Sequence, residues 1–298
     1  MLPKLCLALP LMFSLAMAQT SMILPENSAT RVSDHVYAIV GFPNIAIVIG
    51  SNATLVVDTG LGARNGAIVV REAGKLSKNP KLFLTTTHFH PEHAMGEQAF
   101  PANTIIIRPK AQQEELDQRR DEFIRMFRGF GAGKELLQDV KMRTPDIVFD
   151  REITLDLGGV SARLFWLGTA HTRGDELIFV KEDSVLISGD IVQDKIVPNM
   201  PNDDTSPKNW IVILDQLESL KPRFIVPDHG ALGDGSLIAK ERAILVDLQT
   251  RSLELKRKGV SADEAGKQVT EYVTTKYPGW TTMGPTANVV KRVYAESQ

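Results

Sequence analysis

The chain has 298 residues, of which 34 are Lys or Arg, 36 are Asp or Glu, six are His and one is Cys. This length fits one large domain or two smaller ones, and a hydrophobic fraction of 43% is that of an ordinary globular protein. The composition therefore excludes a disordered or collagen-like chain. A net charge of -2 gives no basic surface for nucleic acid, and a single cysteine excludes both a disulfide framework and a thiolate-rich zinc site.

Residues 1–18 have the three parts of a secretory signal peptide. Lys4 supplies a short positive region, residues 5–15 form an apolar run, and Ala-Met-Ala at 16–18 is a small-x-small cleavage site. The apolar run is too short to span a bilayer comfortably. Cleavage removes Cys6 and leaves a mature chain without cysteine. We therefore expect an exported protein, periplasmic or secreted, with no membrane attachment after cleavage.

Short β-branched runs and helical segments alternate along the rest of the chain. The expected strands are 36–40, 45–49, 54–57, 82–87 and 104–108, followed by 153–157, 162–167, 176–181, 185–188 and 223–226. The expected helices are 65–76, 110–137, 208–220 and most of 236–298. Two strand-rich halves joined by a helical segment predict an α/β fold of two packed sheets with helices outside. No repeat or linker divides the mature chain, so we expect one domain over 19–298.

Three of the six histidines fall in the segment His88-Phe89-His90-Pro91-Glu92-His93, directly after an expected strand. Side chains at positions i and i+2 of an extended segment point the same way, so His88 and His90 can reach one ion. Glu92 and His93 follow the turn at Pro91 and can face a second ion. Imidazole and carboxylate donors without thiolate favour zinc, with iron or manganese as alternatives. Taken alone, the segment could also be a polar loop with incidental histidines.

Three more candidate ligands each follow the end of an expected strand. They are His171 in Gly-Thr-Ala-His-Thr, Asp190 in Ser-Gly-Asp, and His229 in Pro-Asp-His-Gly. Loops at strand ends can gather side chains without disturbing the core. Taken singly, Gly-Asp and Asp-His-Gly are also ordinary turn sequences. Taken together, they supply the ligands that a site for two ions still lacks.

In chain order these segments resemble the metallo-β-lactamase-fold hydrolase superfamily. The matching elements are His-x-His-x-acid-His, Gly-x-x-His-Thr, Gly-Asp and His-Gly, preceded by an early Asp-Thr-Gly at 58–60. The resemblance covers about residues 32–235 and is specific, because five separated motifs occur in order. It implies a four-layer αββα sandwich with a dinuclear metal site at one edge. Residues 236–298 would then form a C-terminal helical extension, which could cover the sandwich or form a dimer face.

The resemblance also implies a role for each candidate residue. His88, His90 and His171 would bind one ion. Glu92, His93 and His229 would bind the other, Asp190 would bridge the two ions, and Asp58 would support the histidine loop from behind. The sequence departs from the family pattern at Glu92, where the family has Asp. The extra methylene moves the carboxylate by about 1 Å, so we expect the second ion to be bound more weakly, to have a different coordination or to be a different metal.

The expected chemistry follows from two neighbouring cations, which make an activated water available near neutral pH. Glu92 could orient this water or move its proton, and Asp190 would hold the ions together. We therefore predict a zinc-dependent, β-lactamase-like hydrolase of a small-molecule ester, lactone, lactam, thioester or phosphoester. Two alternatives stay open. One is an iron-dependent redox enzyme on the same fold, and the other is a non-catalytic metal-binding relative in which Glu92 disables the second site.

Two further segments bear on the substrate. The helix around 115–130 carries four arginines. They predict a basic face, which is either simply solvated or recruits an anionic substrate. We expect Phe123, Phe127 and Phe130 on this helix to lie in the core rather than in a lid over 112–131. The turn-rich loop at 197–204 either forms a wall of the pocket or is a plain surface connection.

Overall fold

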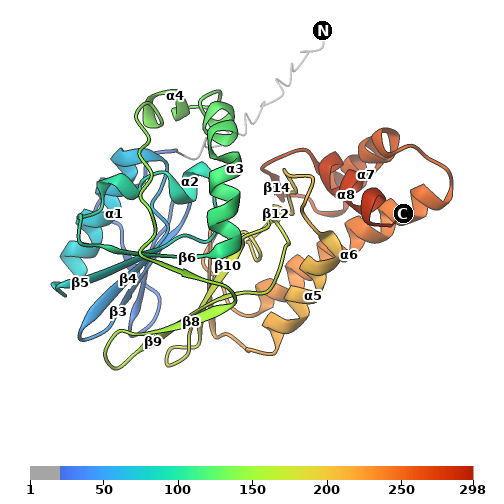
Figure 1. Cartoon of the computed structure of the whole chain (residues 1–298). Coiled ribbons are helices and arrows are strands. Elements are labelled where there is room, and N and C mark those ends of the chain that lie inside the picture. The colour runs from blue at the N-terminus through green and yellow to red at the C-terminus, as the bar shows by residue number, and fades with distance from the viewer. Residues whose placement is uncertain (1–20, 298) are drawn as a thin grey trace, which may run out of the picture.

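A computed structural model describes residues 21–297. The signal peptide predicted for residues 1–18 lies outside the described residues. Helices and strands alternate along the described chain, with two sheets in the middle and helices on both outer faces (Figure 1). No helix among the described residues is long and apolar enough to cross a membrane.

The first sheet has seven strands in sequence order. They are β1 Thr30–Arg31, β2 Val36–Ile39, β3 Ile45–Ile49, β4 Ala53–Val57, β5 Lys81–Thr85, β6 Ile105–Pro109 and β7 Ile147–Phe149. Strands β1 to β4 pair antiparallel, whereas β4 to β7 pair parallel. The sheet is therefore mixed, and its parallel strands end at one common edge.

The second sheet has five strands in the order β13-β11-β10-β9-β8. They are β8 Glu152–Asp156, β9 Ser161–Trp166, β10 Glu176–Val180, β11 Val185–Gly189 and β13 Phe224–Pro227. Strands β9 and β11 are both antiparallel to β10, and β13 is parallel to β11. Strands β9, β11 and β13 therefore end at the same edge, which is where the candidate ligands follow.

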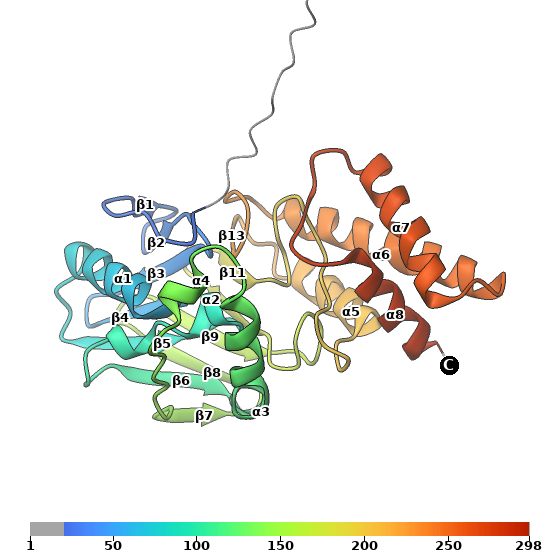
Figure 2. The same ribbon diagram turned by 90° about the horizontal axis from the view of Figure 1, so that it is seen from above.

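Helices cover both outer faces. On the side of the first sheet these are α1 Gly62–Leu76, α2 Pro91–Ala94, η1 Glu97–Ala99, α3 Lys110–Phe127 and α4 Gly133–Leu136. On the side of the second sheet they are α5 Pro207–Glu218, α6 Ser236–Arg257, α7 Ala262–Lys276 and α8 Thr286–Glu296. Figure 2 shows the two groups of helices on opposite sides of the molecule. A short parallel pair, β12 Ile196–Val197 with β14 Thr281–Thr282, joins the loop after β11 to the C-terminal helices.

Side chains that alternate between the two faces of each strand form the apolar layers on both sides of the sheets. On β3, Ile45 and Ile47 pack toward α1, whereas Ala46 and Val48 face the core between the two sheets. On β11, Leu186 instead packs with α5 and α6. Successive side chains of a strand point to opposite faces, so strands that are apolar on both faces are buried on both. This confirms the predicted α/β sandwich with C-terminal helices.

The structure adds elements that the sequence pattern did not predict. Strands β1, β7, β12 and β14 have only two or three residues each, which is too short for a recognisable strand pattern. The expected helix over 110–137 is two helices, α3 and α4, separated by a turn that contains Gly129 and Gly131. Phe130 lies in this turn and is 56% exposed, so its expected place in the core is wrong. The proposed division at about residue 235 stays a prediction.

Helix α1 offers a matched test of close packing near the histidine loop. A Cβ atom at Gly66 would lie 2.1 Å from the carbonyl oxygen of Gly96, whereas one at Gly74 meets nothing within 4 Å. We expect Gly66→Ala to cost about 2 kcal/mol of unfolding free energy through overpacking. Gly74→Ala should instead gain up to about 1 kcal/mol from helix propensity. Urea unfolding of both variants measures the two changes in unfolding free energy. Equal stabilisation by both substitutions would contradict the close packing of Gly66 against Gly96.

Candidate metal centre

The predicted ligands converge at the common edge of the two sheets. His88 and His90 follow β5, His171 follows β9, Asp190 follows β11 and His229 follows β13. The short helix α2 carries the remaining two candidates, Glu92 and His93. All seven side chains are at least 94% buried.

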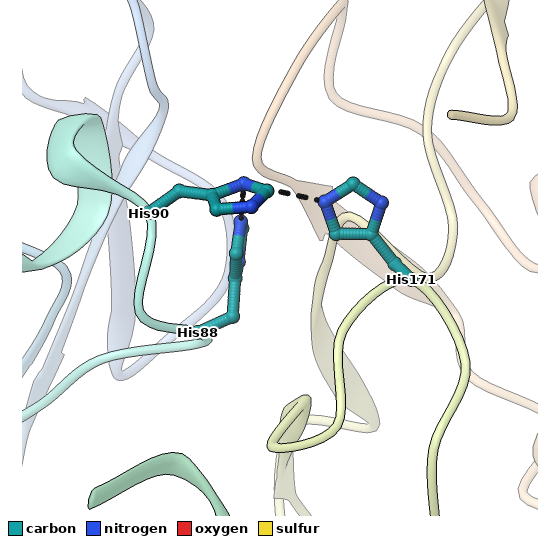
Figure 3. A group of neighbouring side chains, drawn as sticks. All are labelled: His88, His90 and His171. Carbon is teal, nitrogen blue, oxygen red and sulfur yellow. Dashed lines mark hydrogen bonds between the residues drawn. The ribbon is translucent and has the colours of Figure 1, made fainter. Parts of the chain in front are cut away.

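Three imidazoles from two separate loops point at one another (Figure 3). His88 Nε2 lies 2.9 Å from His90 Nδ1, and His171 Nε2 lies 3.4 Å from the same atom. Nitrogen ligands of a tetrahedral zinc ion are about 3.4 Å apart for Zn–N bonds of about 2.0–2.1 Å. This triad therefore has the spacing of three ligands to one ion.

The three imidazoles are poised as neutral donors. Burial, reinforced by the neighbouring histidines, lowers the pKa of His88 and His90 well below the ordinary value. Burial likewise lowers the pKa of His171 to about 4. His171 Nδ1 lies 2.8 Å from the carbonyl oxygen of Asn199 and donates to it, which leaves the lone pair on Nε2. An imidazole fixed in this tautomer is ready to bind a cation.

A second triad consists of Glu92, His93 and His229, whose ligand atoms lie within 4.8 Å of one another. Glu92 Oε1 is 3.7 Å from His93 Nε2. Glutamate therefore reaches the cluster despite its extra methylene. Burial raises the pKa of Glu92 to about 7, although the charge of His93 opposes this shift.

Asp190 lies between the two triads. Its Oδ2 atom is 3.3 Å from His171 Nε2, and its Oδ1 atom is 3.4 Å from His229 Nε2. One carboxylate thus contacts a member of each triad through a different oxygen. This is the arrangement that a bridging ligand needs.

Asp58 and Asp228 form a layer of carboxylates behind the ligands. His93 Nδ1 lies 3.0 Å from Asp58 Oδ2 and 3.1 Å from Asp228 Oδ2. Thr87 donates its backbone N–H to Asp58 and its hydroxyl to Asp228. Asp228 was not among the predicted site residues. Its position directly before His229, at the end of β13, is the feature of the sequence that could have identified it.

These two carboxylates control the proton on His93. Burial by itself lowers the pKa of His93, but the charges of Asp228 and Asp58 outweigh burial and raise it well above the ordinary value. Burial, together with the charge of Asp228, in turn raises the pKa of Asp58 to about 7. Because Nδ1 donates to the carboxylates, the proton that a cation must displace is the one on Nε2.

Unpaired polar atoms show that the residues fit a cation. Buried polar atoms are almost always hydrogen-bonded, so a cluster of unpaired ones needs an explanation. Five of the predicted ligands hold such an atom: His90 Nε2, Glu92 Oε2, His93 Nε2, Asp190 Oδ1 and His229 Nε2. Imidazole and carboxylate groups form the ligand set that zinc takes in catalytic sites.

Glu115 ties helix α3 to the loop that carries His171. Its carboxylate accepts hydrogen bonds from the backbone N–H groups of Arg173 and Gly174 and from the side chain of Asn202. Burial raises the pKa of Glu115 to about 7, helped by the charge of Asp204. The helix and two loops are thus joined through one buried carboxyl group.

Removal of one imidazole tests the metal centre. We expect His171→Ala to weaken binding of zinc by more than about tenfold, because a ligand atom is lost. His35→Ala is the matched control, since His35 pairs with Asp183 away from the cluster. Equilibrium dialysis followed by elemental analysis measures bound metal. Equal metal content in both variants would contradict the assignment.

Glu115→Gln tests the buried carboxyl group. Between the ordinary value of 4.5 and about 7, the folded protein binds the Glu115 proton and the unfolded chain releases it. Stability contributed by this proton is present at low pH and is lost as pH rises through that window. Relative to wild type, the variant should therefore be about 2 kcal/mol more stable at about pH 8 than at about pH 5.

Urea unfolding of the metal-depleted protein at both pH values measures this difference. Glu114→Gln serves as control, because Glu114 is the exposed neighbour on the same helix and should give a much smaller difference. If the two variants respond alike to pH, the role of Glu115 is wrong.

Comparison with known proteins agrees with this geometry. Residues 38–229 match the model of the metallo-beta-lactamase superfamily. A linear primary-alkylsulfatase from Pseudomonas sp. is 23% identical over 72% of this chain and 47% of its own length. A metallo-beta-lactamase type 2 from Bacteroides fragilis is 22% identical over 77% of this chain and 90% of its own length. The chain thus spans about half the length of the alkylsulfatase.

Solved structures show the same fold. A sec-alkylsulfatase from Pseudomonas sp. superposes with a TM-score of 0.72 at 16% identity, over 90% of this chain and 50% of its own. A metallo-beta-lactamase from Pontibacter korlensis superposes with a TM-score of 0.60 at 20% identity, over 74% of this chain and 98% of its own. Given the family match over 38–229, the chain belongs to the metallo-beta-lactamase superfamily.

Proposed function

We propose that this protein is an exported, zinc-dependent hydrolase that binds two ions and acts on an ester, lactone, lactam or phosphoester of a small molecule. The observation that carries the proposal is the convergence of two buried ligand triads with Asp190 between them. Zinc, when bound, supplies Lewis acidity that lowers the pKa of water and polarises the oxygen of the scissile group. The membership in a superfamily of metal-dependent hydrolases supports the same reaction class.

Glu92 is the residue best placed to move a proton. Its carboxyl group is 97% buried, lines the cavity beside the cluster and has one oxygen without a hydrogen-bond partner. This unpaired oxygen can accept a proton from water and return it to a leaving group. His93 and His229 lie beside the carboxylate, with the ligand atoms of the three residues within 4.8 Å of one another.

The relatives widen the set of bonds to be tested. One relative is named an alkylsulfatase and the other a metallo-beta-lactamase, so sulfate esters belong beside lactams in the substrate panel. Export rests on the pattern of residues 1–18, with a positive residue, an apolar run and a small-x-small site. An exported enzyme meets lactams, lactones and small esters.

Metal analysis and a substrate panel test the proposal together. The protein starting at residue 19 should hold about two zinc ions per chain, as expected for a dinuclear hydrolase site. It should hydrolyse at least one of a chromogenic cephalosporin, a lactone, a 4-nitrophenyl ester, a 4-nitrophenyl sulfate and a bis-phosphodiester. Chelation should abolish this turnover. Near-stoichiometric iron with an absorbing ferric band would support a redox enzyme instead, and metal binding without turnover would support a non-catalytic relative.

Glu92→Gln tests the proton transfer. The amide keeps the shape of the side chain but cannot accept a proton, so we expect kcat on the best substrate to fall by about 10²- to 10⁴-fold. Glu114→Gln makes the same chemical change at an exposed site and should leave kcat unchanged. Metal content is measured in parallel. A Glu92→Gln enzyme with full metal and wild-type kcat would contradict the role of Glu92.

A further inference from the structure

A cavity of 420 Å³ lies beside the two ligand triads. Its lining includes His90, Glu92, His171 and Asp190. The rest of the lining is mostly apolar and comes mainly from α3 with the turn after it and from the segment between β14 and α8. Met22, Phe42, Asn199, Pro201 and Asn288 complete it. A concave, largely apolar site with a few converging polar groups is the usual form of a small-molecule pocket.

The first wall is an aromatic and methionine surface on α3 and the turn after it. Phe123 stacks on His90 with the ring centroids 4.8 Å apart and the planes tilted by 17°. Met126, Phe127 and Phe130 continue this surface away from the ligands. Met126 is 42% exposed and Phe130 is 56% exposed. Two of the most exposed large apolar side chains of the described chain therefore line the same cavity.

The opposite wall comes from residues 283–285, outside the part of the chain that matches the family model. The pairing of β12 with β14 fixes this segment to the loop after Asp190. Gly284 packs against the side chain of Asn199, where an added Cβ would lie 2.5 Å from Asn199 Oδ1. The carbonyl group of Asn199 accepts the hydrogen bond from His171. This wall is thus connected directly to a candidate ligand.

The charges in the cavity indicate what it binds. No lysine or arginine lines it among the described residues, and its only acidic side chains are Glu92 and Asp190 of the metal cluster. Away from the cluster, Asn199 and Asn288 are the only uncharged polar side chains, among Met, Phe, Pro and Gly. An anionic group would find no counter-charge there, whereas an uncharged apolar group would be desolvated at no electrostatic cost.

We propose that this cavity binds the uncharged apolar part of the substrate, an alkyl chain or aryl ring attached next to the scissile bond. Phe130 and Met283 are the specificity-determining residues on its two walls. The predicted effect on substrate specificity rests on the proposed hydrolase function. Binding of an apolar group in the cavity can be measured without turnover.

Methionine-methyl NMR on the metal-loaded mature protein tests the cavity directly. Met22, Met126 and Met283 line it, whereas Met95 is buried beneath α3 and does not line it. Titration with 1-hexanol should shift the Met126 and Met283 methyl signals, with an affinity at least about tenfold higher than that of ethanol. The Met95 signal should not move. Absence of a shift at both Met126 and Met283 would overturn the proposal.

Kinetics on 4-nitrophenyl esters then links the cavity to specificity. We expect kcat/KM for the hexanoate to exceed that for the acetate by at least about tenfold in wild type, since each buried methylene adds apolar contact. Phe130→Ala should reduce this ratio by at least about threefold, because it removes apolar contact with the longer acyl chain. Val212→Ala is the control, because Val212 is similarly exposed on α5 away from the cavity.

An acetate preference in wild type, or an equal chain-length ratio in Phe130→Ala and Val212→Ala, would overturn the assignment of the cavity. An enzyme that hydrolyses no substrate of the panel would contradict the proposed function alone. The hexanol titration would then show by itself whether the cavity binds an apolar group.

Discussion

The site depends on one buried hydrogen-bonded network, in which Thr87 joins two carboxylates from different sheets. Asp58 ends β4 of the first sheet and accepts from the backbone N–H of Thr87 at 2.7 Å. Asp228 ends β13 of the second sheet and accepts from the Thr87 hydroxyl at 2.6 Å. Both carboxylates also contact His93 Nδ1. The network therefore fixes the relative position of the two sheet edges and the ring of a candidate ligand at once.

This network explains why the histidine segment has its shape. The chain leaves the first sheet after Thr85, two residues earlier than the sequence pattern predicted. The carbonyl group of Thr86 accepts from the side chain of Gln112, and the N–H group of Thr87 donates to the side chain of Asp58, so neither bonds to a strand of that sheet. Asp58 itself adopts a left-handed backbone with φ of 71°. Such a conformation costs free energy in a residue other than glycine, and it persists where surrounding bonds determine it. The hydrogen bonds of Asp58 to Thr87 and His93 are the bonds that hold it.

The local pattern of the sequence was sufficient to predict the main strands and the convergence of the candidate ligands. Buried strands have continuous apolar runs, and the ligands follow directly after them, so both leave a signal within a few residues. The walls of the cavity leave no such signal. The pairing of Ile196 with Thr281 joins two segments of two residues each, and its existence depends on the packing of the C-terminal helices. The exposure of Phe130 likewise depends on where α3 ends, which an aromatic repeat with helical spacing does not reveal.

Charge balance is the strongest physical argument that the site holds cations. Four carboxylates, those of Asp58, Glu92, Asp190 and Asp228, are buried within one cluster. Among the described residues no lysine or arginine pairs with any of them, and His93 is the histidine whose pKa is raised. Burial consequently raises the pKa of Asp58, Glu92 and Asp190 together. Buried charges are normally paired or bound to metal, so divalent cations between the two triads would balance the surplus of negative charge. The adjoining cavity differs in character, because apart from the cluster its lining is mostly phenylalanine, methionine and proline.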